Sequence, residues 1–359
     1  MAWIRSLRER HASSDHFGRL KRTRRGHQPL QSPVAFIETI ALPTWLFDTR
    51  LGKRLSLNVF RDDQFCLDED GTGFSIRGNK ARKLAFYARQ TPKWLSQTRV
   101  VVSHGGVQSN AMLALAEFCN TLKVPFTYIT RPVPRWLRKT PSGSLERALA
   151  LGMRLCECDS AASYRARVSA MQQEAQQGRS DTLFVPQGVA CPEAAHGLRQ
   201  LAEAIASTNR CDLKTVCVPA GTGTTAWFLR QYLPPTIQVL TVPCVGDTAF
   251  LRAQMGALQA LCQQRDHQIG TLLKPTVQVL PRKQGSFGTP RVEYYRLWRE
   301  LPPYFDLVYA PVTIITLAEH FASEPERLSN VLYIATGGSE GNASQIRRYQ
   351  REFGSTLPT

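Results

Sequence analysis

The stretch "LKTVCVPAGTGTTAWFLRQYL", residues 213–233, runs from an apolar segment through a glycine- and threonine-rich turn into a helical pattern. A β-branched run followed by a turn and an amphipathic segment is typical of a strand leading into a helix. Because buried strands of parallel sheets read as continuous apolar runs, the sequence predicts an α/β fold with parallel sheets and helices on both faces. Similar runs occur in "TRVVVSH" (98–104), "VPFTYIT" (124–130), "IQVLTVPCV" (237–245) and "NVLYIAT" (330–336).

The size and composition of the chain indicate a globular protein. With 359 residues, it is expected to form two domains, at about 150 residues each. No apolar run approaches the roughly 18 residues of a membrane span, so no membrane association is expected. The nine cysteines include no pair of C-x-x-C units, which argues against a zinc site and a disulfide framework. We therefore predict a cytoplasmic protein with reduced thiols and no metal.

The chain is strongly basic, with a formal net charge of +17. Such a charge suits anionic partners, including nucleic acid, acidic lipid or a phosphorylated cofactor. The first 28 residues hold eight Arg or Lys and two acidic residues, and their Arg and Ser content resembles a transit peptide. A start codon assigned too far upstream is another interpretation of this segment. We expect a disordered basic tail over residues 1–30.

The turn "PAGTGTT", residues 219–225, has the features of a phosphate-binding loop. Its glycines free the backbone amides, its threonines supply hydroxyl groups, and a helix N-terminus follows directly. The turn is not a G-x-x-x-x-G-K-[ST] loop, and Ala226 stands where G-x-G-x-x-G would place its third glycine. A tight strand-to-helix turn without a ligand is the alternative interpretation.

A second glycine-rich loop and a lysine complete the pattern. In "SHGGVQSN", residues 103–110, Ser109 and Asn110 begin a helix, where they serve either as caps or as contacts for a carboxylate. In "SIRGNKARKLAFYARQ", residues 75–90, Lys80 follows a Gly-Asn turn at the start of another helix. A phosphate loop, an anion loop and a lysine are the ingredients of a pyridoxal 5'-phosphate site.

Four motifs in register carry a family resemblance. "GNKARKL", "GGVQSN", "GTGTT" and "ATGG" resemble the 1-aminocyclopropane-1-carboxylate deaminase and D-cysteine desulfhydrase family, within the tryptophan synthase β-like (fold type II) class of pyridoxal phosphate enzymes. The resemblance covers roughly residues 32–349. It implies a large cofactor-binding domain from residues 31–83 and 190–359, a small domain from residues 84–189, and a homodimer.

The resemblance also implies a role for each matching residue. Lys80 would be the Schiff-base lysine and proton shuttle, and Asn79 would contact the cofactor or orient that lysine. Ser109 and Asn110 would lie near the substrate carboxylate, with Ser109 as a proton relay. Tyr309, in "DLVYAP", would face the cofactor ring. The phosphate cradle would be formed by Gly221, Thr222, Gly223, Thr224 and Thr225.

Three positions depart from the deaminase pattern. Ala310 replaces a glutamate that meets the pyridine nitrogen, which leaves Thr336 as the candidate partner of that nitrogen. Phe287 replaces a second active-site tyrosine, and Ala111 stands where relatives have histidine or glutamine. Cyclopropane opening needs more polar groups than β-elimination does. The sequence therefore favours a D-cysteine desulfhydrase-like lyase that converts a small amino acid to pyruvate, ammonia and sulfide.

Three alternatives stay open. The chain resembles 1-aminocyclopropane-1-carboxylate deaminases closely enough for that deaminase activity to be the second hypothesis. The losses at Ala310, Phe287 and Ala111 would also suit a non-catalytic binding protein on the same fold. A nucleic-acid binder using the basic residues around Trp136 is the third, but nucleic acid is not expected, because Pro132 and Pro134 favour a solvated loop there.

Overall fold

The computed structural model describes residues 37–47, 55–67, 73–177, 181–208, 212–265, 276–282 and 287–357; the predicted basic tail over residues 1–30 lies outside them. The described strands are β1 (Ile37–Ala41), β2 (Ser56–Phe60), β3 (Val100–His104), β4 (Phe126–Thr130), β5 (Arg154–Glu157), β6 (Thr182–Val185), β7 (Thr215–Ala220), β8 (Gln238–Pro243), β9 (Gln278–Val279) and β10 (Val331–Ile334). The described α-helices are α2 (Gly78–Arg89), α3 (Thr91–Leu95), α4 (Asn110–Thr121), α5 (Arg135–Lys139), α6 (Gly143–Ala150), α7 (Ala161–Gln176), α8 (Ala195–Ala206), α9 (Thr224–Tyr232), α10 (Thr248–Arg265), α11 (Val292–Glu300), α12 (Ala310–His320) and α13 (Asn342–Phe353).

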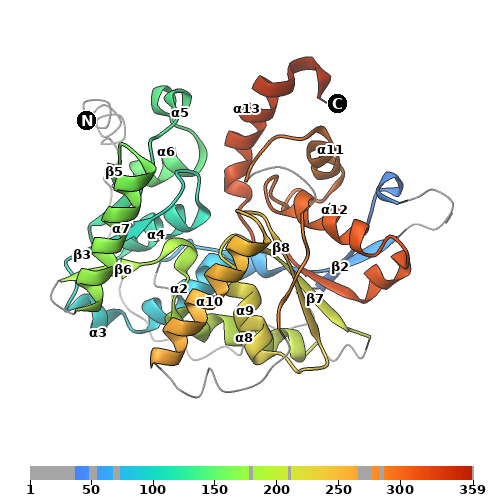
Figure 1. Ribbon diagram of the computed structural model, residues 1–359, viewed down its shortest axis with the longest axis horizontal. Helices are drawn as coiled ribbons and strands as arrows, with labels where there is room; N and C mark the ends of the chain where they lie inside the picture. The colour runs from blue at the N-terminus through green and yellow to red at the C-terminus, as the bar shows by residue number, and fades with distance from the viewer. Residues whose placement is uncertain are drawn as a thin grey trace.

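The strands form two sheets, which lie side by side in Figure 1 with α13 rising between them. The large sheet has the order β1-β2-β10-β7-β8-β9, and the small sheet has the order β5-β4-β3-β6. Within these two sheets, every pairing of described strands is parallel except that of β1 with β2. The predicted α/β class with parallel sheets is confirmed, and the antiparallel edge strand is an addition that the apolar runs did not indicate.

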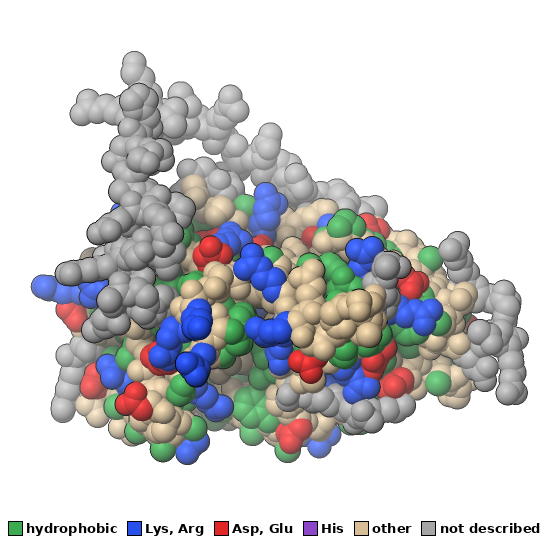
Figure 2. Space-filling view, turned by 90° about the horizontal axis from the view of Figure 1, so that it is seen from above, with side chains coloured by type: hydrophobic (Ala, Val, Ile, Leu, Met, Phe, Trp, Pro, Cys, Tyr) green, Lys and Arg blue, Asp and Glu red, His purple; other side chains and the backbone are tan. Residues whose placement is uncertain are grey.

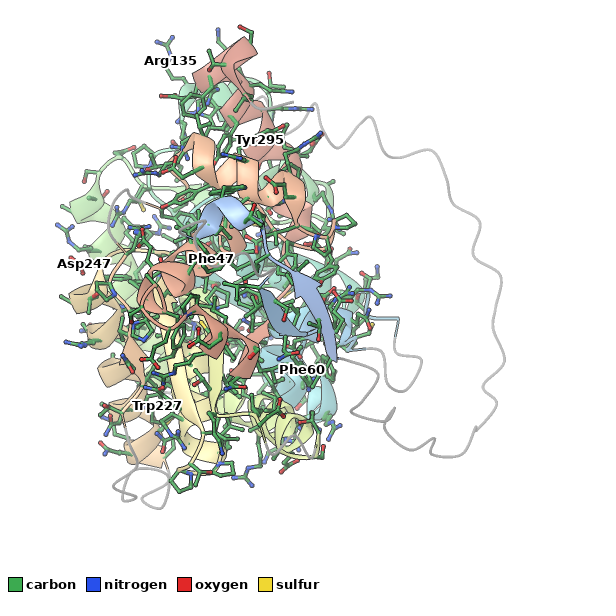
Figure 3. All side chains as sticks on the ribbon, turned by 90° about the vertical axis from the view of Figure 1, so that its right-hand side faces the viewer. Phe47, Phe60, Arg135, Trp227, Asp247 and Tyr295 are labelled. Carbon is green, nitrogen blue, oxygen red and sulfur yellow. The ribbon has the colours of Figure 1, made fainter. Side chains whose placement is uncertain are left out.

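Both sheets are covered by helices on both faces, as their alternating side chains require. In the small sheet, Val101 packs toward α4 and α6, whereas Val102 packs toward α7. In the large sheet, one face packs against α8, α9 and α10, and the other packs against α11 and α12. Phe60 and Trp227, both labelled in Figure 3, belong to the first of these two cores.

The topology brings distant loops together. Strand β10 lies between β2 and β7 and is parallel to both, so the loop after residue 334 and the loop after residue 220 leave the same edge of the sheet. Ligands of open α/β sheets bind at the carboxyl ends of strands. The segments "ATGG" and "GTGTT" are therefore neighbours although about 110 residues separate them in the sequence.

Helix α2, which begins the lysine segment, is wedged between the two sheets. Leu84 and Tyr87 pack in the core of the small sheet, while the opposite side of α2 packs against α8 of the large sheet. A Cβ atom on Gly197 of α8 would lie 2.0 Å from the Arg82 carbonyl oxygen, so only glycine permits this approach. The expected boundary at residue 83 lies within this helix.

None of the helices in the described residues is both long enough and apolar enough to cross a bilayer. The same residues contain no group of three or more His, Cys, Asp or Glu side chains placed to hold a metal ion.

Candidate active site

A cavity of about 180 Å³ opens between the two sheets. Its walls come from the end of β7, from α2, α4 and α6, and from the loops that precede α9 and α13. All eleven residues that the sequence proposed for the site line this cavity: Asn79, Lys80, Ser109, Asn110, Gly221, Thr222, Gly223, Thr224, Thr225, Tyr309 and Thr336.

Lys80 lies in the first turn of α2, and the loop after β10 fixes the start of this helix. The Asn79 backbone N–H donates to the Thr336 carbonyl oxygen at 3.2 Å. Gly78 has φ +66°, and a Cβ atom there would lie 2.6 Å from that oxygen, so the preceding residue has to be glycine. Burial lowers the pKa of Lys80 to about 8, against the opposing charges of Asp306, Asp62 and Glu340. About a tenth of the amine is therefore unprotonated and nucleophilic at pH 7, far more than for an ordinary lysine.

The turn before α9 is built to leave its amides free. Gly223 occupies the N-cap position with φ +73° and provides no capping side chain. A Cβ atom at this position would lie 2.5 Å from Met255 Cγ, so α10 closes the space behind the turn. Thr222 Oγ1 and Thr224 Oγ1 are 2.8 Å apart, and both side chains are buried. The amides and hydroxyls at this helix terminus form a concave donor surface for an anion.

Thr225 joins this turn to the lysine segment. Its hydroxyl donates to Asn79 Oδ1 at 3.2 Å. This bond fixes the orientation of the Asn79 amide, because the side-chain oxygen is occupied and the NH2 group is left as the donor. The amide thus lies beside Lys80 with a defined polarity.

Lys83 also lines the cavity, and the motif reasoning missed it. Its side chain is buried, with 4% exposure, and its Nζ donates to the Gly188 carbonyl oxygen at 3.0 Å. A Cβ atom on Gly188 would lie 2.9 Å from Thr222 Cγ2, so this lysine reaches the phosphate-loop side of the cavity. Burial, and then the charge of Lys80, hold the pKa of Lys83 well below its ordinary value. The i, i+3 spacing from Lys80 on one helix face was the available signal.

No carboxylate among the described residues forms an ion pair with Lys83. A buried cation without a counter-charge is costly, and a bound dianion would remove that cost. The donor set at Lys83 and at the Gly221–Thr225 turn therefore fits a phosphate group.

The loop before α4 faces the turn from the small sheet. Ser109 is the N-cap of α4, and its Oγ accepts from the backbone N–H groups of Ala111 at 3.2 Å and Met112 at 3.4 Å. Ser109 is thus a helix cap that also lines the cavity. Tyr128 from β4 supports the loop by donating to the Gly106 carbonyl oxygen at 3.2 Å.

Asn110, at the start of α4, lies against the glycine loop after β10. A Cβ atom on Gly338 would lie 2.2 Å from Asn110 Nδ2, and Gly338 has φ +105°. Gly338 in "ATGG" therefore combines a close approach to α4 with a backbone conformation that favours glycine.

Tyr309 is the N-cap residue of α12 and lines the cavity. The buried carboxylate of Asp306 accepts from the backbone N–H groups of Val308 at 2.9 Å and Tyr309 at 2.5 Å. Burial raises the pKa of Tyr309, so its phenol stays protonated and can donate a hydrogen bond. The Phe287 ring lies over it, with 5.8 Å between ring centroids. Burial also raises the pKa of Asp306 to about 6.

The far side of the cavity is charged. Arg147 on α6 pairs with Glu117 on α4 at 2.9 Å, and Arg77 and Glu340 complete this wall. Burial raises the pKa of Glu117, with Arg147 lowering it and Glu340 raising it further. These residues lie outside the glycine motifs, and only their shared cavity identifies them.

The fold has solved counterparts. No family model matches the chain, and no curated protein sequence matches it. A crystal structure of a 1-aminocyclopropane-1-carboxylate deaminase homologue is similar with a TM-score of 0.66 and 19% identity, over 86% of this chain and 93% of that chain. A hydrogen sulfide-producing enzyme from Fusobacterium nucleatum has a TM-score of 0.53 and 11% identity, over 87% and 99% of the two chains.

A pyridoxal 5'-phosphate-dependent aspartate racemase has a TM-score of 0.50 and 14% identity, over 84% of this chain and 90% of that chain. The chain therefore has the fold of these enzymes, which is the fold type II architecture that the four motifs predicted.

Proposed function

We propose that the protein is a pyridoxal 5'-phosphate-dependent lyase or deaminase acting on a small amino acid, with D-cysteine desulfhydrase-like β-elimination as its reaction. One observation carries the proposal. The Lys80 amine, whose pKa is lowered by burial, shares a cavity with the N-terminus of α9, which has no side-chain cap, and with the buried Lys83, which has no carboxylate partner among the described residues. A nucleophilic amine beside a phosphate-shaped donor set matches the two reactive ends of this cofactor.

The residues present fit the cofactor. The Gly221–Thr225 turn and Lys83 would hold the phosphate, Asn79 would orient the group beside Lys80, and Tyr309 and Thr336 line the same cavity. When bound, pyridoxal phosphate supplies an aldehyde for the lysine amine and a conjugated ring that withdraws electrons from the substrate's α-carbon.

Residues of the protein itself would transfer the proton and orient the substrate. The Lys80 amine, with its pKa near 8, accepts the α-proton and can return it. Asn110 and the loop before α4 orient the substrate carboxylate opposite the phosphate turn. Tyr309 donates a hydrogen bond from a phenol that burial keeps protonated. The fixed helix starts of α2, α4 and α12 hold these groups in place.

The polar groups around Tyr309 favour elimination over opening of a cyclopropane ring. Phe287 packs on Tyr309 where a second hydroxyl would be needed, and Ala310 is fully buried and apolar. A thiolate leaves from the β-carbon without strong acid assistance, whereas an unactivated ring does not open without it. The products of elimination from D-cysteine would be sulfide and, after hydrolysis, pyruvate and ammonia.

The first test is the absorption spectrum of the purified protein with pyridoxal phosphate, compared with Lys80→Ala and with Lys214→Ala as the control at an exposed lysine. The band of lysine-linked cofactor is expected in the wild type and in Lys214→Ala and absent in Lys80→Ala. Pyruvate from D-cysteine would support the desulfhydrase, and 2-oxobutanoate from 1-aminocyclopropane-1-carboxylate would support the deaminase alternative. A wild type without the band would overturn the proposal in favour of a non-catalytic binding protein.

A further inference from the structure

A pair of cysteines lies far from the cavity, at the edge of the small sheet. Cys156 belongs to β5, the edge strand, and Cys158 follows the strand directly. Residues two apart along an extended chain point to the same face. Both side chains belong to the apolar cluster around Val102 and Ile129 that α7 covers. Both thiols are free.

The two thiols interact with each other. Burial raises the pKa of Cys158, and the charge of Cys156 and a hydrogen bond with its side chain raise it further. Their exposure differs, because Cys156 is half-buried and Cys158 is buried. A small molecule can therefore reach Cys156 first, with Cys158 poised behind it.

The extended backbone makes a disulfide between Cys156 and Cys158 strained. Two residues apart along a strand correspond to about 6.6 Å between Cα atoms, and disulfides usually span up to about 6.8 Å with a preferred separation near 5.5–6 Å. Closing the bond therefore shortens the strand end and displaces the intervening residue, Glu157. Strained bonds of this kind are easily reduced, which is the property of regulatory disulfides.

Glu157 connects the strand to helix α5. Its Oε1 accepts from the Val133 backbone N–H at 2.7 Å and from the Arg138 guanidinium group. Helix α5 in turn reaches across to α13, where the Arg351 guanidinium carbon lies 4.4 Å from the centroid of the Trp136 ring. In Figure 3, Arg135 of α5 lies at the same end of the molecule as α13.

The contact between α5 and α13 joins the two halves of the protein. Helix α13 follows the glycine loop of the cavity, and its Ser344 donates to Gln108 in the loop before α4 at 3.4 Å. Figure 2 looks onto the end where α5 and α13 lie and shows Lys and Arg side chains gathered on that face. Like charges on α5 and α13 repel each other. The hydrogen bonds from Val133 and Arg138 to Glu157 therefore help to keep α5 in its place.

We propose that Cys156 and Cys158 form a redox-active dithiol whose oxidation by a small-molecule disulfide releases α5 from β5. The Cys156 thiolate attacks one sulfur of the disulfide RSSR, which gives a mixed disulfide and one RS−. The Cys158 thiolate then attacks the Cys156 sulfur and expels the second RS−. Two protein thiols are oxidised, one RSSR is reduced, and the two thiol protons end on two RSH molecules.

The chemical step is tested on the full chain with a series of oxidised and reduced glutathione, followed by alkylation and trypsin. Cleavage after Arg154 and Arg165 gives one peptide, 155–165, that holds both cysteines. We expect an internal disulfide in the wild type and in Cys66→Ser, the control at the other half-buried cysteine among the described residues. Cys158→Ser is expected to retain glutathione on Cys156. An alkylated peptide or a lasting glutathione adduct in the wild type would overturn the proposal.

The release of α5 has its own measurement. Amide hydrogen exchange of residues 136–140 is expected to become at least about tenfold faster on oxidation in the wild type and unchanged in Cys158→Ser. Glu157→Ala, which removes the link without oxidation, should give the same acceleration under reducing conditions. A disulfide that forms without faster exchange in α5 would contradict the coupling. Neither readout depends on bound cofactor.

Discussion

The loops before α4 and α9 are both glycine-rich turns that lead from a strand into a helix, but they treat the helix N-terminus differently. Before α4, Ser109 is a side-chain cap that accepts from two backbone N–H groups. Before α9, Gly223 leaves the first amides without such an acceptor. A capping side chain accepts hydrogen bonds from the first backbone N–H groups of its helix, whereas an uncapped helix leaves these groups available to an external anion. The comparison supports our proposal that the loop before α9 binds phosphate, while the loop before α4 lines the opposite side of the cavity.

The largest expected effect comes from breaking the uncapped loop with Gly223→Ala. The new Cβ atom would meet Met255 Cγ at 2.5 Å in a backbone conformation with positive φ. We expect a loss of about 2–3 kcal/mol in the free energy of unfolding and no detectable cofactor binding, measured by thermal unfolding and absorbance titration. Gly256→Ala on α10, where nothing lies within 4 Å, is the control. Equal effects of the two variants would refute this account of the loop.

Lys83→Met should separate stability from binding. Replacing a buried amine, whose charged form burial and Lys80 disfavour, by an apolar side chain is expected to stabilise the cofactor-free protein by about 1 kcal/mol. Loss of a charged hydrogen bond to phosphate should weaken cofactor binding by about 10- to 100-fold. Calorimetry of the cofactor-free protein and an equilibrium titration measure the two quantities. Weaker binding without any gain in stability would show that Lys83 already has a counter-charge.

The pKa of Lys80 predicts how fast the cofactor is linked. With a pKa of about 8, the reactive amine rises from about a tenth of the population at pH 7 to about nine-tenths at pH 9. The initial rate of the absorbance change should therefore increase about tenfold over this range and then level off. In Asp306→Asn the midpoint should fall, because the Asp306 charge favours the ammonium form. A rate that continues to rise beyond pH 10 would show an unperturbed lysine.

Ser109→Ala has the smallest expected effect on cofactor binding. It tests the capped helix α4 in the way that Gly223→Ala tests the uncapped helix α9. Loss of the cap should cost about 1 kcal/mol of stability, measured by chemical denaturation. Cofactor affinity should stay within about twofold, since Ser109 bonds its own helix and not the phosphate turn. Ser109→Asn, which can cap, is the matched control. A cofactor affinity that falls as far as in Lys83→Met would place phosphate at the wrong loop.

The sequence predicted the local parts of the fold and site well. Each apolar run that we interpreted as a strand is one, and the α/β class is confirmed. The residues proposed for the site line one cavity, although their roles stay predictions. The antiparallel strand β1 was not predicted, because the sequence of a five-residue strand does not show whether it pairs parallel or antiparallel.

The sequence by itself determined the features that depend on neighbouring residues: strands from β-branched runs, glycine turns before α4 and α9, and a lysine at the start of α2. The tertiary structure alone decided the features that depend on burial and on distant contacts. Lys83 meets Gly188, 105 positions away, and Asp306 and Glu340 act on Lys80 from the other end of the chain. A pKa, a missing counter-charge and a shared cavity arise only when the chain has excluded water and brought such residues together.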